Sequence, residues 1–453
     1  MTIKEYISLN KDEIIKDLAE FVRIPSVSSK GEHMDEAAEY LCNLMKKCGI
    51  KTQIFPTAMY PVVYGEANCG DPQKPVILMY GHYDVQPAEP LEKWNTPPFE
   101  PTIIDGVLYG RGATDNKGYN VDYIHGVHAL LETEGRLPCT VKFIFEGCEE
   151  NGSIGLEDFF KSHKDLLSAE FAMMVDGPRH ETGKPWMSLG CKGLLNLQLT
   201  LRTMDRDVHS ANAPVLPSAA WDMVRLLNKL VDEDGHVNIP GFYDDVCEIT
   251  PLERKVMAET IPSTEAASRA LYHPVRILKR PGMTFEENLN YTPTCNISGI
   301  WSGYTGSGAK TVLTAEANVK FDMRLAPNQN GDIILENLKK WLLDNGYDNV
   351  TVHKFAHVLP SKTPLEVRGV KIVREACRKV FDSEPIVTPV GCGTAPLYMF
   401  TDVLDIPIIF SRYSDLDCNN HSPNEKITLD LLLKGVEYMA QIYKMTGYES
   451  LEV

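Results

Sequence analysis

The sequence predicts an α/β protein in which a large mixed sheet is interrupted by a smaller α+β unit. Short apolar strands alternate with helices before residue 180, a pattern typical of a parallel or mixed sheet covered by helices. The pattern changes after residue 190 and returns to strand and helix alternation from residue 362. We therefore expect one large domain formed by residues 1–190 and 359–453, with residues 191–358 inserted into it.

The first part of the chain opens with two helices. Apolar residues recur at helical spacing over 14–22 and Pro25 ends that helix, while a second helix is expected over 35–48. The expected strand at 76–80 is wholly apolar, as in a strand buried on both faces. The other expected elements are strands at 53–56, 62–66, 141–145 and 171–175, and helices over 117–132 and 154–162.

The inserted part has a different texture. Residues 194–202 and 315–323 alternate as half-exposed strands, and residues 218–230 and 333–343 are helical. Strand, helix, strand, helix, strand is the ferredoxin-like order of a small antiparallel sheet with two helices on one face. Residues 232–292 have weak periodicity and many prolines, and they give no assignment. After the insertion we expect a helix over 370–381, a strand at 406–410 and a closing helix over 429–443.

Composition excludes several classes of partner. The 45 basic and 62 acidic side chains give a net charge of −17 without a dense basic stripe, which disfavours nucleic acid and anionic membrane surfaces. No apolar run is long enough to span a bilayer. The eleven cysteines form no C-x-x-C pair, and the start Met1-Thr2-Ile3-Lys4-Glu5 does not look like a secretory signal. We expect a cytoplasmic protein.

Histidine and carboxylate residues follow the expected strands, at the edge where open α/β sheets bind ligands. His82 and Asp84 lie two positions apart after the strand at 76–80, so on an extended segment they point the same way. An imidazole that binds a metal usually donates its other N–H to a carboxylate, and Asp84 is placed to do this for His82. A His–Asp pair that caps the next helix is the alternative.

Asp115 lies in the glycine-rich stretch 110–118, just before an expected helix. A helix N-cap is one interpretation of this position. A carboxylate with one oxygen on each of two metal ions is the other, and only the neighbouring acidic motifs favour it.

Glu149 and Glu150 follow the strand at 141–145. On an extended chain, adjacent residues face opposite ways, so one carboxylate can bind metal while the other faces the substrate. The second carboxylate can then act as general base and acid. A solvated acidic loop is the alternative, and the preceding apolar strand disfavours it.

Charge balance favours two metals. Asp176 ends the apolar run 172–175, and His421 offers a second imidazole from the far end of the chain. Asp115, Glu150, Asp176 and one bridging hydroxide neutralise two divalent cations, whereas one cation would leave a costly excess of buried negative charge. Two histidines and three carboxylates suit zinc, with manganese or cobalt as substitutes.

Four segments together resemble the family of co-catalytic zinc hydrolases that contains aminoacylase, acetylornithine deacetylase, succinyl-diaminopimelate desuccinylase and carnosinase. They are Gly81-His82-Tyr83-Asp84-Val85-Gln86-Pro87, Tyr109-Gly110-Arg111-Gly112, Asp115-Asn116-Lys117-Gly118 and Glu149-Glu150-Asn151-Gly152-Ser153. The resemblance implies that His82, Asp115 and Asp176 hold one metal, that Asp115, Glu150 and His421 hold the other, that Asp84 orients His82, and that Glu149 is the base. It also implies a large zinc-hydrolase domain whose inserted unit serves as lid and homodimer surface.

Two further runs are most similar to carnosinase-type dipeptidases. They are Gly306-Ser307-Gly308-Ala309-Lys310-Thr311-Val312 and Phe321-Asp322-Met323-Arg324-Leu325. Thr394 lies in Gly391-Cys392-Gly393-Thr394, where those dipeptidases carry a glycine pair and a serine, so by the resemblance it contacts the substrate carboxylate. The similarity implies that Arg324 clamps the substrate carboxylate as a guanidinium fork, and that Thr311 contacts the substrate. It also implies that His209 reaches into the site of the partner subunit and stabilises the oxyanion.

These residues predict a metallopeptidase that hydrolyses the amide bond of a dipeptide or small peptide through a two-metal-bridged hydroxide, with Glu149 as general base. Deacylation of N-acyl amino acids uses the same chemistry and is the main alternative. A catalytically silent metal-binding homologue would lack a ligand or a base, and none is missing. A phosphoesterase would also use paired metals.

His125 and His128 share a helix face, but packing explains them better than a third metal, and a nucleophilic role for Cys392 is disfavoured.

Overall fold

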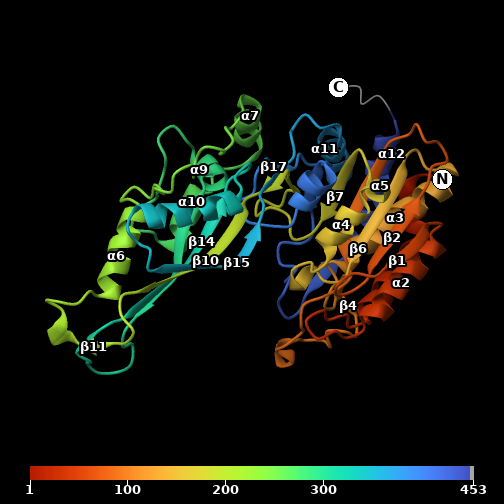
Figure 1. Ribbon diagram of the computed structural model, residues 1–453. Helices are drawn as coiled ribbons and strands as arrows, with labels where there is room; N and C mark the ends of the chain where they lie inside the picture. The colour runs from red at the N-terminus through yellow and green to blue at the C-terminus, as the bar shows by residue number, and fades with distance from the viewer. Residues whose placement is uncertain (449–453) are drawn as a thin grey trace.

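The computed structural model describes residues 1–448, and two separate sheets dominate it. Figure 1 shows the larger sheet on the right of the molecule and the smaller one on the left. The strands of the larger sheet, in spatial order, are β1 (Lys51–Phe55), β2 (Val62–Ala67), β6 (Thr140–Glu146), β3 (Val76–His82), β7 (Phe171–Val175), β18 (Ile408–Arg412), β8 (Trp186–Ser188) and β17 (Ile386–Thr388). The expected mixed α/β architecture is confirmed.

The central strands of the large sheet are parallel and buried on both faces. β3 pairs in parallel with β6 and β7, and β18 pairs in parallel with β7. Ile77 and Met79 of β3 belong to the core beneath α1 (Ile3–Val22), α3 (Lys117–Glu134) and α12 (Leu429–Gly447), whereas Leu78 and Tyr80 pack on the opposite side with α4 (Leu156–Ser162). Burial on both faces explains why β3 is apolar throughout.

Helices and short strands complete this part of the chain. The remaining helices are α2 (Met34–Lys47), α5 (Lys164–Leu167) and α11 (Arg368–Phe381). The shorter elements are β4 (Thr102–Ile104), β5 (Val107–Tyr109), β19 (Lys426–Thr428), β9 (Gly190–Cys191), β16 (Ser361–Lys362) and the helical turns η1 (Leu91–Lys93), η2 (Glu149–Asn151) and η4 (Met399–Leu404). β19, which follows the segment of His421, pairs with β5, which precedes the loop of Asp115. This pairing holds the two segments next to each other.

The smaller sheet is antiparallel. Its strands, in spatial order, are β12 (Thr294–Ser302), β14 (Glu316–Leu325), β10 (Gly193–Arg202) and β15 (Val350–Val358). Alternate leucines of β10 enter a core shared with α6 (Ala219–Leu230) and α10 (Gly331–Asp344). β12 has no counterpart among the expected strands, because its side chains are mostly exposed or half-buried and leave no alternating pattern. The division at residues 190 and 358 stays a prediction, and residues 449–453 of its third segment lie outside the described residues.

The segment without a sequence assignment contains three short helices. They are α7 (Pro251–Thr260), α8 (Glu265–Tyr272) and α9 (Phe285–Tyr291). α7 lies against the edge strand β17, where the hydroxyl of Thr260 accepts a hydrogen bond from the backbone N–H of Val387 at 3.1 Å. α7 therefore covers an edge of the large sheet.

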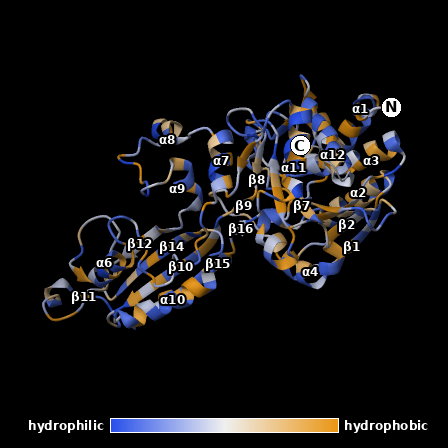
Figure 2. Cartoon of the chain, turned by 90° about the horizontal axis from the view of Figure 1, so that it is seen from above, coloured by the Kyte–Doolittle hydropathy of each residue, from blue (hydrophilic) through white to orange (hydrophobic). Residues whose placement is uncertain are grey.

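Several helices, such as α6 and α11, are amphipathic. In Figure 2, orange and blue alternate along them, as expected for segments with one face in a core and one in solvent. Across residues 1–448, no helix combines the length and the apolar character that a bilayer crossing requires.

Candidate metal centre

Strand ends of the large sheet gather the predicted metal ligands. His82 ends β3, Asp176 follows β7, and Glu150 lies in the turn η2 just after β6. Because β3 is parallel to both neighbours, the three carboxyl ends meet at one edge of the sheet. Asp115 comes from the loop before α3, and His421 lies between β18 and β19.

The five residues form two groups that share Asp115. The ligand atoms of His82, Asp115 and Asp176 lie within 4.8 Å of one another, and so do those of Asp115, Glu150 and His421. Asp115 Oδ1 is 3.2 Å from His82 Nε2, and Asp115 Oδ2 is 3.0 Å from His421 Nε2. One oxygen of the carboxylate thus faces each group, which is the arrangement of a bridge between two cations.

The nitrogen of His82 that faces Asp115 has no hydrogen-bond partner. His82 is buried, yet its Nε2 makes no hydrogen bond. Its Nδ1 lies 3.1 Å from the carbonyl oxygen of Asp84 and 3.3 Å from its carboxylate. An imidazole whose Nδ1–H is held in this way offers its Nε2 lone pair to a metal, so the donor set fits a divalent cation bound to nitrogen and oxygen.

The carboxylates of the two groups raise the pKa values of both histidines. Hydrogen bonds with Asp115 and Glu150 raise the pKa of His421 to about 10. Burial lowers the pKa of His82, but the carboxylates of Asp115 and Asp176 outweigh it, and the net pKa is well above the usual value. Burial, followed by the charge of Asp115, raises the pKa of Asp176 to about 6. Cations bound here would displace these protons.

Glu149 stands beside the two groups without belonging to either. Burial is the main cause that raises its pKa to about 8, so the carboxyl is poised to accept and return a proton near neutral pH. The expectation that Glu149 and Glu150 face opposite ways on an extended chain was wrong, because both residues lie in the 3-10 turn η2. The carboxylate of Asp84 accepts the backbone N–H groups of Glu149 and Glu150 at 3.2 and 3.1 Å, and so fixes this turn as well as His82.

Arg324 and Thr394 lie together. Arg324 Nη1 donates a hydrogen bond of 2.8 Å to Thr394 Oγ1, which joins β14 of the small sheet to the chain after β17.

His209 and Thr311 lie at the far tip of the small sheet. β11 (Val208–His209) pairs there with β13 (Val312–Leu313), and the backbone N–H of Ser210 donates to the carbonyl of Thr311. Both predicted residues are exposed, and Figure 1 shows β11 remote from the large sheet. Within one chain, the structure does not bring them to the metal groups.

Several supporting residues were missed by sequence reasoning. Gln86 donates to Glu150 Oε2 at 2.8 Å, Asn120 donates to the carbonyl of His82 at 2.6 Å, and Asn116 donates to the carbonyl of Val175 at 2.9 Å. Each of the three lies within a motif quoted above or close behind one. Only the folded structure reveals their partners. Asn116, not Asp115, is the N-cap residue of α3, so the capping interpretation of Asp115 is not needed.

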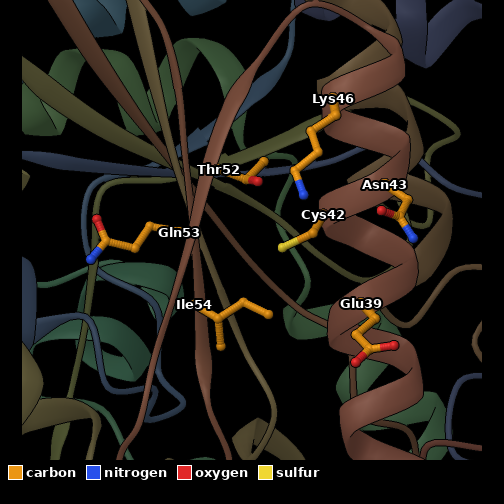
Figure 3. A pocket seen from close by; sticks show the side chains of 7 residues that line it. All are labelled: Glu39, Cys42, Asn43, Lys46, Thr52, Gln53 and Ile54. Carbon is orange, nitrogen blue, oxygen red and sulfur yellow. The ribbon is translucent and has the colours of Figure 1, made fainter.

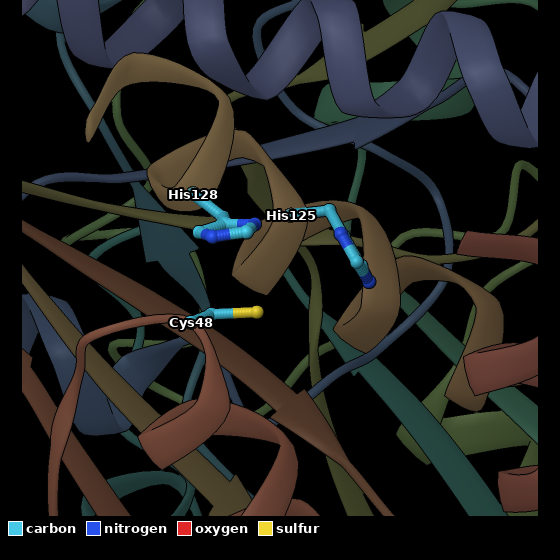
Figure 4. A group of neighbouring side chains, drawn as sticks. All are labelled: Cys48, His125 and His128. Carbon is cyan, nitrogen blue, oxygen red and sulfur yellow. The ribbon is translucent and has the colours of Figure 1, made fainter. Parts of the chain in front are cut away.

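In a third group of possible ligands, each of the two histidines has one ring nitrogen in a hydrogen bond. Figure 4 shows Cys48, His125 and His128 near one another. His125 Nε2 lies 2.9 Å from Asp17 and His128 Nδ1 lies 2.5 Å from the hydroxyl of Tyr6. Burial raises the pKa of Cys48 to about 12, so the sulfur is a thiol. We assign the group to packing between α1, α2 and α3.

The hollow drawn in Figure 3 lies away from the metal ligands. It has a volume of about 360 Å³ and lies between α2 and the edge strand β1. Its lining residues are Glu39, Cys42, Asn43, Lys46, Thr52, Gln53 and Ile54. None of the predicted site residues is among them.

Comparison with known proteins points to one family. The sequence matches the description "Peptidase family M20/M25/M40" over residues 78–445. It is 30% identical to the human Beta-Ala-His dipeptidase, over 97% of this chain and 91% of that protein. It is 29% identical to the Cys-Gly metallodipeptidase dug1 of Schizosaccharomyces pombe, over 96% and 95%.

Solved structures agree. The M20 family metallo-carboxypeptidase Sso-CP2 of Sulfolobus solfataricus superimposes with a TM-score of 0.82 at 35% identity, covering 96% of this chain and 99% of that chain. Human carnosine dipeptidase 1 gives a TM-score of 0.69 at 28% identity and covers 98% of both chains.

Proposed function

Because this chain belongs to peptidase family M20/M25/M40 and is a metallopeptidase, we propose that it hydrolyses the amide bond of dipeptides and small peptides. The observation that carries the proposal is Asp115, whose two oxygens face two ligand groups with Glu149 alongside. The names of the dipeptidase relatives support the substrate class. The two histidines and three carboxylates suit zinc best, and manganese and cobalt are substitutes.

The residues divide the work of amide hydrolysis. When bound, the two cations supply Lewis acidity, which polarises the amide carbonyl and lowers the pKa of a water molecule. Glu149 takes a proton from that water and then donates it to the leaving amine. Arg324 and Thr394 hold the carboxylate of the substrate, so that the scissile bond lies beside Glu149.

A substrate panel tests the proposed function. After removal of metal and reconstitution with zinc, we expect dipeptides with a free carboxylate to be cleaved far faster than their C-terminal amides. Replacing Arg324 with Met should lower kcat/KM for the free dipeptide about 10- to 100-fold, because a charged hydrogen bond contributes about 1.5–3 kcal/mol, and should leave the amide almost unaffected.

The matched control is Arg202→Met, which removes an exposed arginine that pairs with Glu316 on the same sheet. It should behave as the wild type. Faster cleavage of N-acetyl or N-succinyl amino acids than of dipeptides would replace the proposal with deacylation, and turnover of a phosphate monoester alone would replace it with phosphoesterase activity.

We also propose a cytoplasmic homodimer in which His209 and Thr311 complete the site of the other subunit. Their exposure at the tip of the small sheet supports this arrangement, and the free state of the described cysteines supports a reducing compartment. In such a dimer the imidazole of His209 stabilises negative charge on the carbonyl oxygen, a contribution of about 100- to 1,000-fold in kcat.

Subunit complementation tests this arrangement. Glu149→Gln and His209→Ala homodimers should each be nearly inactive. A heterodimer of the two variants, purified through two different tags, should recover about half the wild-type activity, because one of its two sites combines Glu149 with the His209 of the other chain. A heterodimer as inactive as its parents would show that His209 does not act across the interface.

A further inference from the structure

Glu425 is a buried carboxylate whose two oxygens are both occupied by the loop that carries Asp115. Its Oε2 accepts from Arg111 Nη1 at 2.7 Å and from the backbone N–H of Gly112 at 2.9 Å. Its Oε1 accepts from the backbone N–H groups of Thr114 and Asp115, both at 3.0 Å. Glu425 has no exposed surface. Three backbone N–H groups of one loop, those of Gly112, Thr114 and Asp115, are therefore held by a single carboxylate.

The same carboxylate joins this loop to the segment of His421. The backbone carbonyl of Glu425 accepts the N–H of Gly110 at 3.0 Å. The hydroxyl of Thr114 lies 2.7 Å from Asn420 Oδ1 and 3.2 Å from Glu425 Oε1. The loop before α3 and the chain around His421 are thus tied together at both ends of the segment 420–425, although they are about 300 residues apart in the sequence.

Arg111 neutralises the buried charge of Glu425. Arg111 is only 1% exposed, it lies over the ring of Trp94, and its Nη2 donates to the carbonyl of Pro87 at 3.3 Å. A buried carboxylate without such a partner would cost several kcal/mol. Pro87 follows Gln86, which holds Glu150, so the pair also touches the segment that supports the second metal group.

Gly112 shows that the backbone is adapted to this contact. Its φ of +90° is rare for residues with a side chain, and a Cβ there would lie 2.8 Å from Val85 Cγ1. Only glycine lets the backbone N–H turn towards Glu425 at this point.

We propose that Glu425, with Arg111, is the positioning residue of the two-cation centre. By holding the backbone N–H of Asp115, it aims one oxygen of Asp115 at each ligand group, and it keeps His421 Nε2 within 3.0 Å of Asp115 Oδ2. Glu425 itself contacts neither cations nor substrate. The inference rests on the proposed two-cation centre, and it predicts that the affinity for cations depends on a carboxylate that does not bind them.

Zinc titration of the metal-stripped protein, in competition with a chromophoric chelator, tests the inference. In Glu425→Gln, the amide group must face either Arg111 and Gly112 or Thr114 and Asp115 with a donor in place of an acceptor. We expect zinc to bind about 10- to 100-fold more weakly, the usual cost of losing an outer partner of a metal ligand. At saturating zinc, kcat should recover in large part, because the base Glu149 is untouched.

Glu253→Gln is the matched control. Glu253 is also buried, pairs with Lys362 at 2.6 Å and accepts the backbone N–H of Thr250 at 2.8 Å, but it lies in α7. Its variant should lose thermal stability to a similar degree and bind zinc as the wild type does. That contrast separates positioning from a merely structural role.

Glu425→Asp covers the case in which the glutamine variant does not fold. It keeps the charge but shortens the side chain by one methylene, so we expect a smaller loss of zinc affinity. Wild-type zinc affinity in a folded Glu425→Gln or Glu425→Asp variant would overturn the inference. If the wild type itself bound no zinc, the proposed function would fail instead.

Discussion

Replacing Glu149 with Gln is expected to lower kcat about 100- to 10,000-fold, the range for loss of a general acid and base, while both cations stay bound. The glutamine amide cannot take a proton from water near neutral pH. Glu149 lies outside both ligand groups, so its removal leaves the five ligands in place. Steady-state kinetics and metal analysis of the same preparation measure the two halves of the prediction.

Glu157→Gln is the control for this variant. Glu157 belongs to α4, which follows the turn of Glu149, and its carboxylate accepts from Lys161 and Tyr398 on the surface. It should keep wild-type kinetics. A Glu149→Gln enzyme with near-normal kcat, or one that has lost a cation, would remove Glu149 from the role of base.

Replacing Asp115 with Asn is expected to remove both cations and all measurable activity. The amide has one acceptor oxygen and no charge, so neither group keeps its shared ligand. Loss of one partner from a buried charged cluster costs about 3–5 kcal/mol, which corresponds to at least about 100-fold in affinity. Zinc stoichiometry measured after dialysis checks the prediction, and circular dichroism shows whether the variant is folded.

Asp176→Asn provides the comparison, because Asp176 belongs to only one of the two groups. We expect this variant to weaken one cation and to keep the other. An Asp115→Asn protein that retained one tightly bound zinc would show that the two groups do not share a bridge.

The elements with strong periodicity could be predicted from the sequence. β7 was expected at the residues where it occurs, and the β3 and α12 patterns were recognised, because burial on one or two faces leaves a repeating apolar signal. The ligand groups could be anticipated for a related reason: His82, Glu150 and Asp176 follow strands whose ends meet at one sheet edge.

The remaining features depend on contacts that leave no local pattern. β12 is largely exposed, α8 has no buried side chain, and α7 and α9 are short helices whose buried side chains include polar ones. Glu425 acts on residues about 300 positions earlier in the chain, so no spacing could reveal it. The turn of Glu149 is helical because Asp84 captures two successive N–H groups, a contact between segments that propensity does not encode.

Anomalous diffraction at the zinc edge, from crystals grown with zinc, tests the two-cation centre most directly. We expect two peaks, one on each side of the Asp115 carboxylate. One should lie next to His82 and Asp176, and the other next to Glu150 and His421. A single peak, or peaks found only beside Cys48, His125 and His128, would contradict the account.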